Sequence, residues 1–286
     1  MMAIAYVLIV FFTVVQSAST KVFNRYSQSS SVFNSIKAIS AFCAFVLMSI
    51  PIVDFHLPTL AFGALYGVCL CISMYSGYKA LCLGPMALTS MIASFSVVVP
   101  IIWGFTVGRE LITATRLFAI ALLLFAIVLT NANKIFKKER SDGAFSGAWV
   151  VFTGVTFVFN GVCSTLQKAY KFSYPDAENS EFMMYAMLVC SIVFSFVSLS
   201  KASLSDIMKT PKKHFGIIAG VSNGLAGFFT LVLAGFENAS VLFPMISAGT
   251  LLGAMLCGRL VFKERLKANH YVALLAGMAA VVLLNI

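Results

Sequence analysis

The segment Ala80–Gly108, ALCLGPMALTSMIASFSVVVPIIWGFTVG, contains no Asp, Glu, Lys or Arg. A helix needs about 20 apolar residues to cross the hydrocarbon core of a bilayer, so this segment is long enough to span a membrane. The rest of the chain has the same character, since 60% of its 286 residues are hydrophobic and only 10% are charged. A soluble domain could not cover its surface with so few charges. The sequence therefore predicts a membrane protein.

Charge-free segments of this kind recur along the whole chain. We predict an all-α integral membrane protein with ten transmembrane helices joined by short loops, which leaves no soluble domain. An arrangement of eight or nine spans with a re-entrant segment is the alternative. The seven cysteines fall inside or beside the segments and are expected to pack as small apolar residues, with no disulfide framework, metal site or cofactor. The segments are Met1–Thr20, Ala38–Val53, Phe55–Tyr78, Ala80–Gly108, Leu117–Asn133, Gly143–Gln167, Phe182–Ser200, His214–Phe236, Asn238–Gly258 and Ala268–Ile286.

An internal repeat organises these segments. Ala80–Asn131 aligns without a gap on Ala234–Asn285, and Glu110 then falls on Glu264. The first segments of the two halves align at a slightly different offset. We predict two five-helix repeats, residues 1–142 and 143–286, within one membrane domain. Because five is odd, the repeats must be inverted relative to one another, an architecture that recurs in transporters with the substrate near the membrane midplane at the repeat interface.

The junction motifs of the two repeats resemble a known family. Gly108-Arg109-Glu110-Leu111 in the first half corresponds to Gly258 followed by Lys263-Glu264-Arg265-Leu266 in the second. Together with the ten predicted spans, these motifs resemble the EamA-like branch of the drug/metabolite transporter superfamily over essentially the whole chain. The resemblance implies transport by alternating access and leaves the substrate open. Many characterised members are described with cytoplasmic termini, which differs from the orientation predicted by the charges below.

The basic residues are distributed unevenly over the predicted loops. Fifteen of the 20 Lys and Arg residues fall in the first, third, fifth, seventh and ninth loops, four in the other loops, and Lys37 inside a span. Because basic loops stay in the cytoplasm, both termini are predicted to be extracytoplasmic and the Lys134–Arg140 loop cytoplasmic. The basic loops that orient the chain in the membrane also account for its net charge of +10. We therefore expect a lipid bilayer as partner and no nucleic acid. The expected location is the bacterial plasma membrane, as a multi-pass monomer or homodimer.

Lys37 is the one basic residue inside a predicted span, Ser31–Val53. An ammonium in hydrocarbon costs about 3 kcal/mol or more, so such residues usually reach an interface or face a polar cavity. One interpretation is that Lys37 extends its long stem to the interface. The other is that it faces a cavity and binds an anionic group of a cargo molecule. Asn34, three residues earlier, shares its helical face.

Further candidate substrate-binding residues are polar or aromatic groups in other spans. Thr13, Ser17 and Thr20 form a polar stripe beside Gln16, and Asn160, Ser164 and Gln167 form the corresponding stripe in the second half. The alternative role for both stripes is hydrogen bonding between helices. Asn223 is an isolated amide inside a span. Tyr75 and Tyr78 either stack on a ligand or belong to the interfacial aromatic belt.

Other features predict packing and helix geometry. The spacings Gly63-x3-Gly67 and Gly216-x3-Gly220-x3-Gly224 are typical of helices that approach closely. Pro100 should kink or weaken its helix. Glu110 and Glu264 each precede a helix, where a carboxylate favours the N-terminus, so we expect both to act as structural caps.

These features favour a transporter of a small polar metabolite that is neutral, zwitterionic or anionic. The first span contains no carboxylate, whereas the related small multidrug resistance proteins use a glutamate there to exchange protons for cationic drugs. Export of cationic or amphipathic compounds is therefore a weaker alternative, as is a scaffold or receptor without transport. An enzyme is not expected, because the three histidines lie at span ends and no Asp pair or glycine-flanked serine lies within a span.

Overall fold

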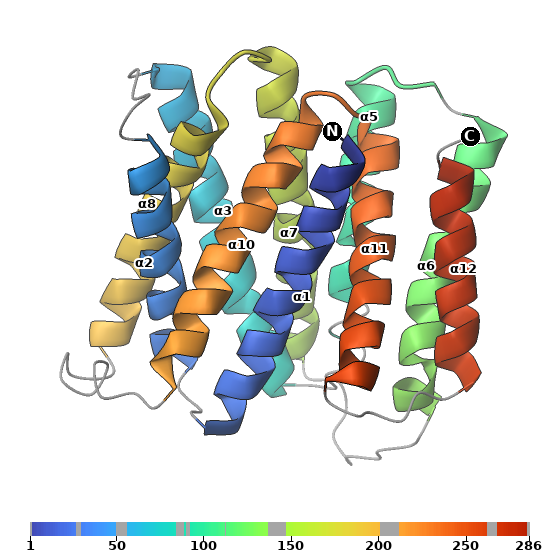
Figure 1. Cartoon of the computed structure of the whole chain (residues 1–286), viewed down its shortest axis with the longest axis horizontal. Helices are drawn as coiled ribbons and strands as arrows, with labels where there is room; N and C mark the ends of the chain where they lie inside the picture. Colours follow the sequence, from blue (N-terminus) through green and yellow to red (C-terminus); the bar gives the residue numbers. More distant parts are fainter. Residues whose placement is uncertain are drawn as a thin grey trace. The chain divides into compact units, whose positions relative to one another are not determined.

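The computed structural model of the chain describes residues 2–26, 30–49, 56–83, 89, 92–111, 113–136, 147–200, 212–261 and 268–284. Every regular element among these residues is helical (Figure 1). The predicted all-α fold is confirmed to this extent. The elements are α1 (Met2–Tyr26), α2 (Ser30–Ser49), α3 (Leu57–Leu83), the 3-10 helix η1 (Phe95–Val97), α5 (Val98–Thr106), α6 (Ala114–Phe136), α7 (Gly147–Ser173), α8 (Asn179–Leu199), α10 (Lys213–Ala234), α11 (Ala239–Leu260) and α12 (Ala268–Leu284).

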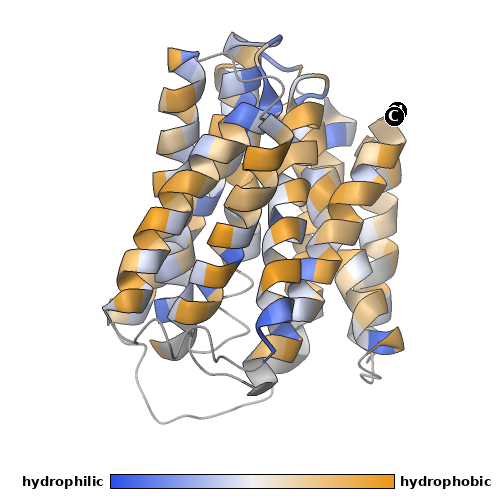
Figure 2. Ribbon diagram, turned by 60° about the vertical axis from the view of Figure 1, so that its left-hand side comes forward, coloured by the Kyte–Doolittle hydropathy of each residue, from blue (hydrophilic) through white to orange (hydrophobic). Residues whose placement is uncertain are grey.

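Seven of these helices are long and apolar enough to cross a membrane: α1, α2, α3, α7, α8, α10 and α11. Three shorter apolar helical segments, Ile92–Thr106, Ala114–Leu129 and Tyr271–Leu284, lie at other predicted spans. Figure 2 shows hydrophobic residues along most of each helix and hydrophilic residues mainly toward the helix ends. This is the pattern of a multi-pass membrane protein. The count of ten spans and the inverted repeat stay predictions.

Many large apolar side chains lie on the surface of these helices. Leu47, Phe196 and Leu260 are 72%, 77% and 74% exposed. A soluble monomer rarely exposes large contiguous apolar patches, because water opposes them. Surfaces of this kind suit the hydrocarbon of a bilayer, where apolar side chains meet lipid tails of similar polarity.

The chain forms two compact units, each assembled from separate parts of the sequence. The first unit comprises Met1–Cys71 and Ala169–Gly235, and the second comprises Ile72–Lys168 and Phe236–Ile286. Each unit thus takes residues from both predicted repeats. Compact units and sequence repeats are different divisions of the chain, so the repeat boundaries 1–142 and 143–286 stay a prediction. Glu264 and residues 137–140 of the predicted cytoplasmic loop lie outside the described residues.

In the first unit, α1 packs against α10, and α2 packs against both α8 and α10. Glycines bring α3 and α8 together. A Cβ atom on Gly63 would lie 2.7 Å from the carbonyl oxygen of Phe182, and one on Gly67 would lie 2.6 Å from that of Ala186. No real Cβ fits at such distances. The predicted close approach at these glycines is confirmed.

The glycines of α10 have the same role against α2. A Cβ atom on Gly220 would overlap the carbonyl oxygen of Lys37 and the hydroxyl of Ser40, and one on Gly224 would lie 2.6 Å from the ring of Phe45. Backbones that approach this closely gain dispersion contacts, which matter in a membrane because burial from lipid gives little hydrophobic driving force. The packing of α10 therefore fixes the position of Lys37.

In the second unit, α6 packs against α12, and α11 packs against α12, α5 and α6. Leu123 and Ile127 of α6 form a buried apolar cluster with Ala248 of α11 and Ala280 of α12. The alanines leave room for the larger side chains of α6 between the helices. This cluster joins α6, α11 and α12 within the second unit.

The segment around Pro100 is not a continuous α-helix. The 3-10 helix Phe95–Val97 comes directly before α5, and the backbone N–H of Val98 bonds to the carbonyls of Phe95 and Ser96. Proline has no N–H to donate, and its ring displaces the carbonyl one turn earlier. The local change from 3-10 to α geometry agrees with the predicted weakening of the helix. Pro244 lies inside α11.

Candidate functional site

Lys37 lies within the first unit, on the helix face that packs against neighbouring helices. Its side chain is only 8% exposed. Cys190 of α8 is close enough to interact with it electrostatically. No described residue forms a hydrogen bond or an ion pair with its ammonium group. A side chain that extended to the membrane interface would be exposed, so this burial opposes the first interpretation. Binding of a cargo group by Lys37 stays a prediction.

Two other predicted site residues belong to the first unit. Gln16 of α1 and Asn223 of α10 are both partly buried. The backbone carbonyl of Gln16 accepts a hydrogen bond from the hydroxyl of Thr20 at 2.8 Å. No hydrogen bond between described residues joins Gln16, Asn223 and Lys37 to one another. Neither amide side chain forms a hydrogen bond to another described residue, so both retain hydrogen-bonding capacity.

The second unit contains a polar network between α3 and α7. The hydroxyl of Ser73 donates to the amide oxygen of Asn160 at 2.7 Å. One turn further along α3, the hydroxyl of Thr156 donates to that of Ser76 at 3.0 Å. A Cβ on the neighbouring Gly77 would lie 3.3 Å from the Thr156 methyl group, so the helices are close here. Asn160 thus forms the interhelical bond given above as the alternative role, and its amide nitrogen is the group left for a ligand.

The remaining three predicted residues differ in environment. Gln167 is 4% exposed and interacts with other residues of the chain. Tyr75 and Tyr78 are 45% and 39% exposed, and the ammonium of Lys79 lies 5.8 Å from the centre of the Tyr75 ring. Exposed aromatic side chains are typical of the interfacial aromatic belt. Stacking of either ring on a ligand stays a prediction that a binding measurement would test.

The hydroxyl stripe of α1 is satisfied within its own helix. Thr13 donates to the carbonyl of Ile9 at 2.8 Å, and Ser17 donates to that of Thr13 at 2.9 Å. A helical Ser or Thr often bonds the carbonyl four residues earlier. These hydroxyl protons are therefore not available to a ligand or a neighbouring helix, although the sequence pattern alone indicates a polar stripe.

A carboxylate caps a helix distant from it in sequence. Glu110 Oε1 and Oε2 accept the backbone N–H groups of Ala239 at 2.5 Å and Ser240 at 2.9 Å, at the start of α11. Capping was predicted, but for the helix that follows Glu110, which is α6. Nothing in the local sequence could indicate α11, because its first residue is 129 positions away.

The turn that carries Glu110 has a specific geometry. Arg109 adopts a left-handed backbone conformation with φ of 51°, and the N–H of Glu110 bonds to the carbonyl of Gly104 at 3.0 Å. This ends α5 and directs the carboxylate back along the helix. A Cβ on Gly104 would lie 2.8 Å from the carboxyl carbon of Glu110, so only glycine leaves space for it. Lys168 donates to the carbonyl of Glu237 nearby, at 2.5 Å.

Comparison with known proteins shows the fold but no family. No protein-family model matches the chain, and no curated protein matches it. A solved structure described only as "Crystal structure of protein" is similar, with a TM-score of 0.71 over 99% of this chain and 98% of its own, at 12% identity. At that identity the likeness extends to the fold alone. In the described part of the chain, no group of three or more His, Cys, Asp or Glu side chains is placed to hold a metal ion.

Proposed function

We propose that the protein is a transporter that moves a small polar metabolite across a membrane by alternating access, of the type found in the EamA-like branch of the drug/metabolite transporter superfamily. The cargo is neutral, zwitterionic or anionic. Transport is secondary-active or facilitative. Ten spans arranged as two inverted repeats are part of this proposal, supported by seven long apolar helices and three shorter apolar segments at the predicted positions.

The burial of Lys37 is the observation that carries this proposal. Lys37 lies inside an apolar helix long enough to span a membrane and is 8% exposed, and its ammonium has no hydrogen-bonding or ion-pairing partner among the described residues. Removing a charge from water costs several kcal/mol unless a partner compensates. Ionisable groups inside membrane segments therefore mark ion or substrate pathways by default. An anionic group of the cargo would supply the missing partner.

Amide side chains complete the proposed recognition. Gln16 and Asn223, in the same compact unit as Lys37, retain hydrogen-bonding capacity inside apolar helices. A polar cargo loses its hydration in the membrane and needs such groups in exchange. The seven long apolar helical spans contain a single carboxylate, Glu181 in the first turn of α8, and this scarcity of negative charge opposes a bare cation as cargo.

Two steps test the proposal. A thermal-unfolding screen of the purified chain against neutral, zwitterionic and anionic metabolites identifies a ligand, because binding to the native state raises the melting temperature. Uptake of that metabolite is then measured in proteoliposomes containing the wild type, Lys37→Met, or no protein. We expect saturable uptake by the wild type and a loss of at least tenfold in the variant, which keeps the length of the side chain and removes its charge. Binding without any flux would identify a receptor or scaffold instead.

A further inference from the structure

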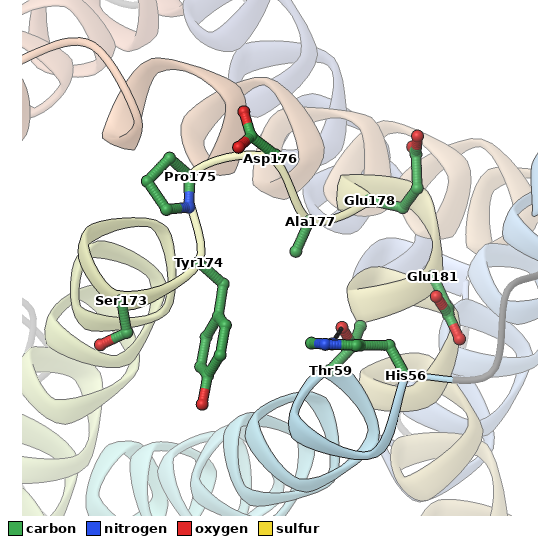
Figure 3. Close-up of a pocket in the computed structure, with 9 residues that line it drawn as sticks. All are labelled: His56, Thr59, Ser173, Tyr174, Pro175, Asp176, Ala177, Glu178 and Glu181. Carbon is green, nitrogen blue, oxygen red and sulfur yellow. Dashed lines mark hydrogen bonds between the residues drawn. The ribbon is translucent and has the colours of Figure 1, made fainter.

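A pocket lies in the first unit, where α3 begins and the turn between α7 and α8 closes over it (Figure 3). Its volume is about 580 Å³, within the range of sites for small organic molecules. It lies at the ends of three helices, where α3 begins, α7 ends and α8 begins. The side chains that matter below are His56, Thr59, Tyr174, Asp176, Glu178 and Glu181.

Glu181 is the buried charged group in the pocket wall. It is only 2% exposed. The hydroxyl of Tyr185 donates to Oε1 at 2.8 Å, and no described residue donates to Oε2. An ionised carboxylate accepts up to about four hydrogen bonds, so the described residues use only part of this capacity. A buried carboxylate with an unused oxygen at a cavity wall favours a ligand that carries a positive charge.

No cationic side chain from the pocket wall neutralises Glu181. Lys171, in the last turn of α7, donates to the carbonyls of Pro175 at 2.7 Å and Ala177 at 2.9 Å, and these bonds stabilise the turn between α7 and α8. The exposed carboxylates of Asp176 and Glu178 point away from the pocket centre in Figure 3 and add negative potential at its rim. The pocket therefore has a negative potential, and the side chains of Asp176 and Glu178 do not fill its centre.

Aromatic rings form another part of the wall. The rings of His56 and Tyr174 meet edge to face, with centroids 5.6 Å apart. Thr59 Oγ1 lies 3.0 Å from His56 Nδ1 and 2.9 Å from the hydroxyl of Tyr170, so a hydrogen-bonded chain orients the imidazole. Ring faces attract organic cations through their quadrupole and also contact alkyl groups.

We propose that this pocket is a binding site for a small organic ammonium ion. The charged nitrogen meets Glu181 Oε2, and the alkyl part lies against Tyr174 and His56. A metal ion fits the site less well, because no described group of three or more acidic, His or Cys side chains converges as a metal requires and the pocket is far larger than a metal ion. The site is distinct from Lys37 and does not depend on the transport proposed above.

A purely structural role for Glu181 predicts different behaviour. The residue lies in the first turn of α8, where a carboxylate interacts favourably with the helix dipole. If Glu181 had only this structural role, its substitution would change stability, and neither the wild type nor any variant would bind the ammonium ion. The experiment must therefore measure binding separately from stability.

The test uses the full chain in detergent or nanodiscs, with n-butylammonium chloride as the probe and 1-butanol as the uncharged control. Melting temperature is followed against probe concentration, with sodium chloride added to keep the ionic strength constant. We expect butylammonium to raise the melting temperature in a saturable way and 1-butanol to have no such effect. Glu181→Gln should raise the apparent Kd at least about tenfold, because a charge-assisted hydrogen bond is lost. The matched control Glu178→Gln should stay within about threefold of wild type, as a rim charge contributes little.

A second pair of variants keeps the test decisive if Glu181→Gln fails to fold. Tyr174→Leu removes the ring and should weaken butylammonium binding about threefold or more, whereas Tyr174→Phe keeps the ring and should bind like wild type. The proposal is overturned by equal shifts with butylammonium and 1-butanol, by no shift in the wild type, or by wild-type affinity in Glu181→Gln. A larger saturable shift with calcium chloride than with butylammonium would also overturn it, in favour of a metal site.

Discussion

The carboxylate of Glu110 accepts the backbone N–H of Ala239 at 2.5 Å, joining the turn after α5 to the first residue of α11. The first N–H groups of a helix have no partner within it, and inside a membrane protein water cannot reliably supply one. One glutamate therefore satisfies two donors of α11. Gly104 makes this contact achievable by leaving space for the carboxylate.

This contact predicts the first stability change. Glu110→Ala leaves the N–H groups of Ala239 and Ser240 without their acceptor, and we expect a cost of about 1–2 kcal/mol in the free energy of unfolding. Glu178→Ala is a matched control, because Glu178 occupies the N-cap position of α8 and forms no side-chain capping bond. It should change stability by less than about 0.5 kcal/mol. Equal destabilisation by both variants, measured by denaturant or thermal unfolding, would contradict the assigned cap.

A second prediction concerns the contact of α10 with α2. Gly220→Ala places a methyl group against the Lys37 carbonyl and the Ser40 hydroxyl, and we expect destabilisation of about 1–3 kcal/mol from overpacking. Gly154→Ala in α7 meets no atom within 4 Å and should be neutral or stabilising by up to about 1 kcal/mol, because alanine favours helix. Melting temperatures of the two variants, compared with wild type, check both signs. A neutral Gly220→Ala would show that α2 and α10 can separate at little cost.

Lys37→Met should separate stability from function. Removing a buried ammonium that has no partner among the described residues is expected to raise the free energy of unfolding by about 1–3 kcal/mol. Transport of the identified cargo should fall at the same time, because function commonly retains residues that cost stability. The two readouts are thermal unfolding and proteoliposome flux. A less stable variant with unchanged flux would assign Lys37 a structural role.

Topology is tested by cysteine labelling in a background from which the native cysteines are removed. The turn between α7 and α8 is predicted to face outward and residues 137–140 inward, from the Lys and Arg distribution. An impermeant maleimide added to sealed cells should therefore label Ala177→Cys and spare Lys138→Cys. Labelling after membrane permeabilisation provides the control for reactivity. The reverse pattern would give the chain the cytoplasmic termini described for many EamA-like proteins.

Much of the helical architecture could be predicted from the sequence. Long charge-free segments predict spans because every backbone polar group in hydrocarbon must be bonded within a helix or a closed barrel. The glycine spacings predicted close helix contacts, and the contacts of Gly63 and Gly220 confirm them. Both inferences hold because they depend on composition and on the period of a single helix, which are local properties.

The partners of individual polar side chains could not be predicted in the same way. Asn160 and Thr13 both read as stripe residues, yet one bonds Ser73 of another helix and the other bonds a carbonyl of its own. Which partner a side chain reaches depends on helix rotation and separation, and apolar sequence permits many such arrangements at similar energy. Sequence spacing therefore identified polar positions and left their roles open.

The sequence by itself determined that the chain is helical, apolar and suited to a bilayer, because these properties depend on composition and on hydrogen bonds between residues close together in the chain. Only the tertiary structure decided that Lys37 is buried, that Glu110 caps α11, and that Glu181 lines a pocket beside His56. These three relationships join residues far apart in the chain, and their geometry follows from how helices pack. Packing is a collective property of several helices, so no single segment contains it.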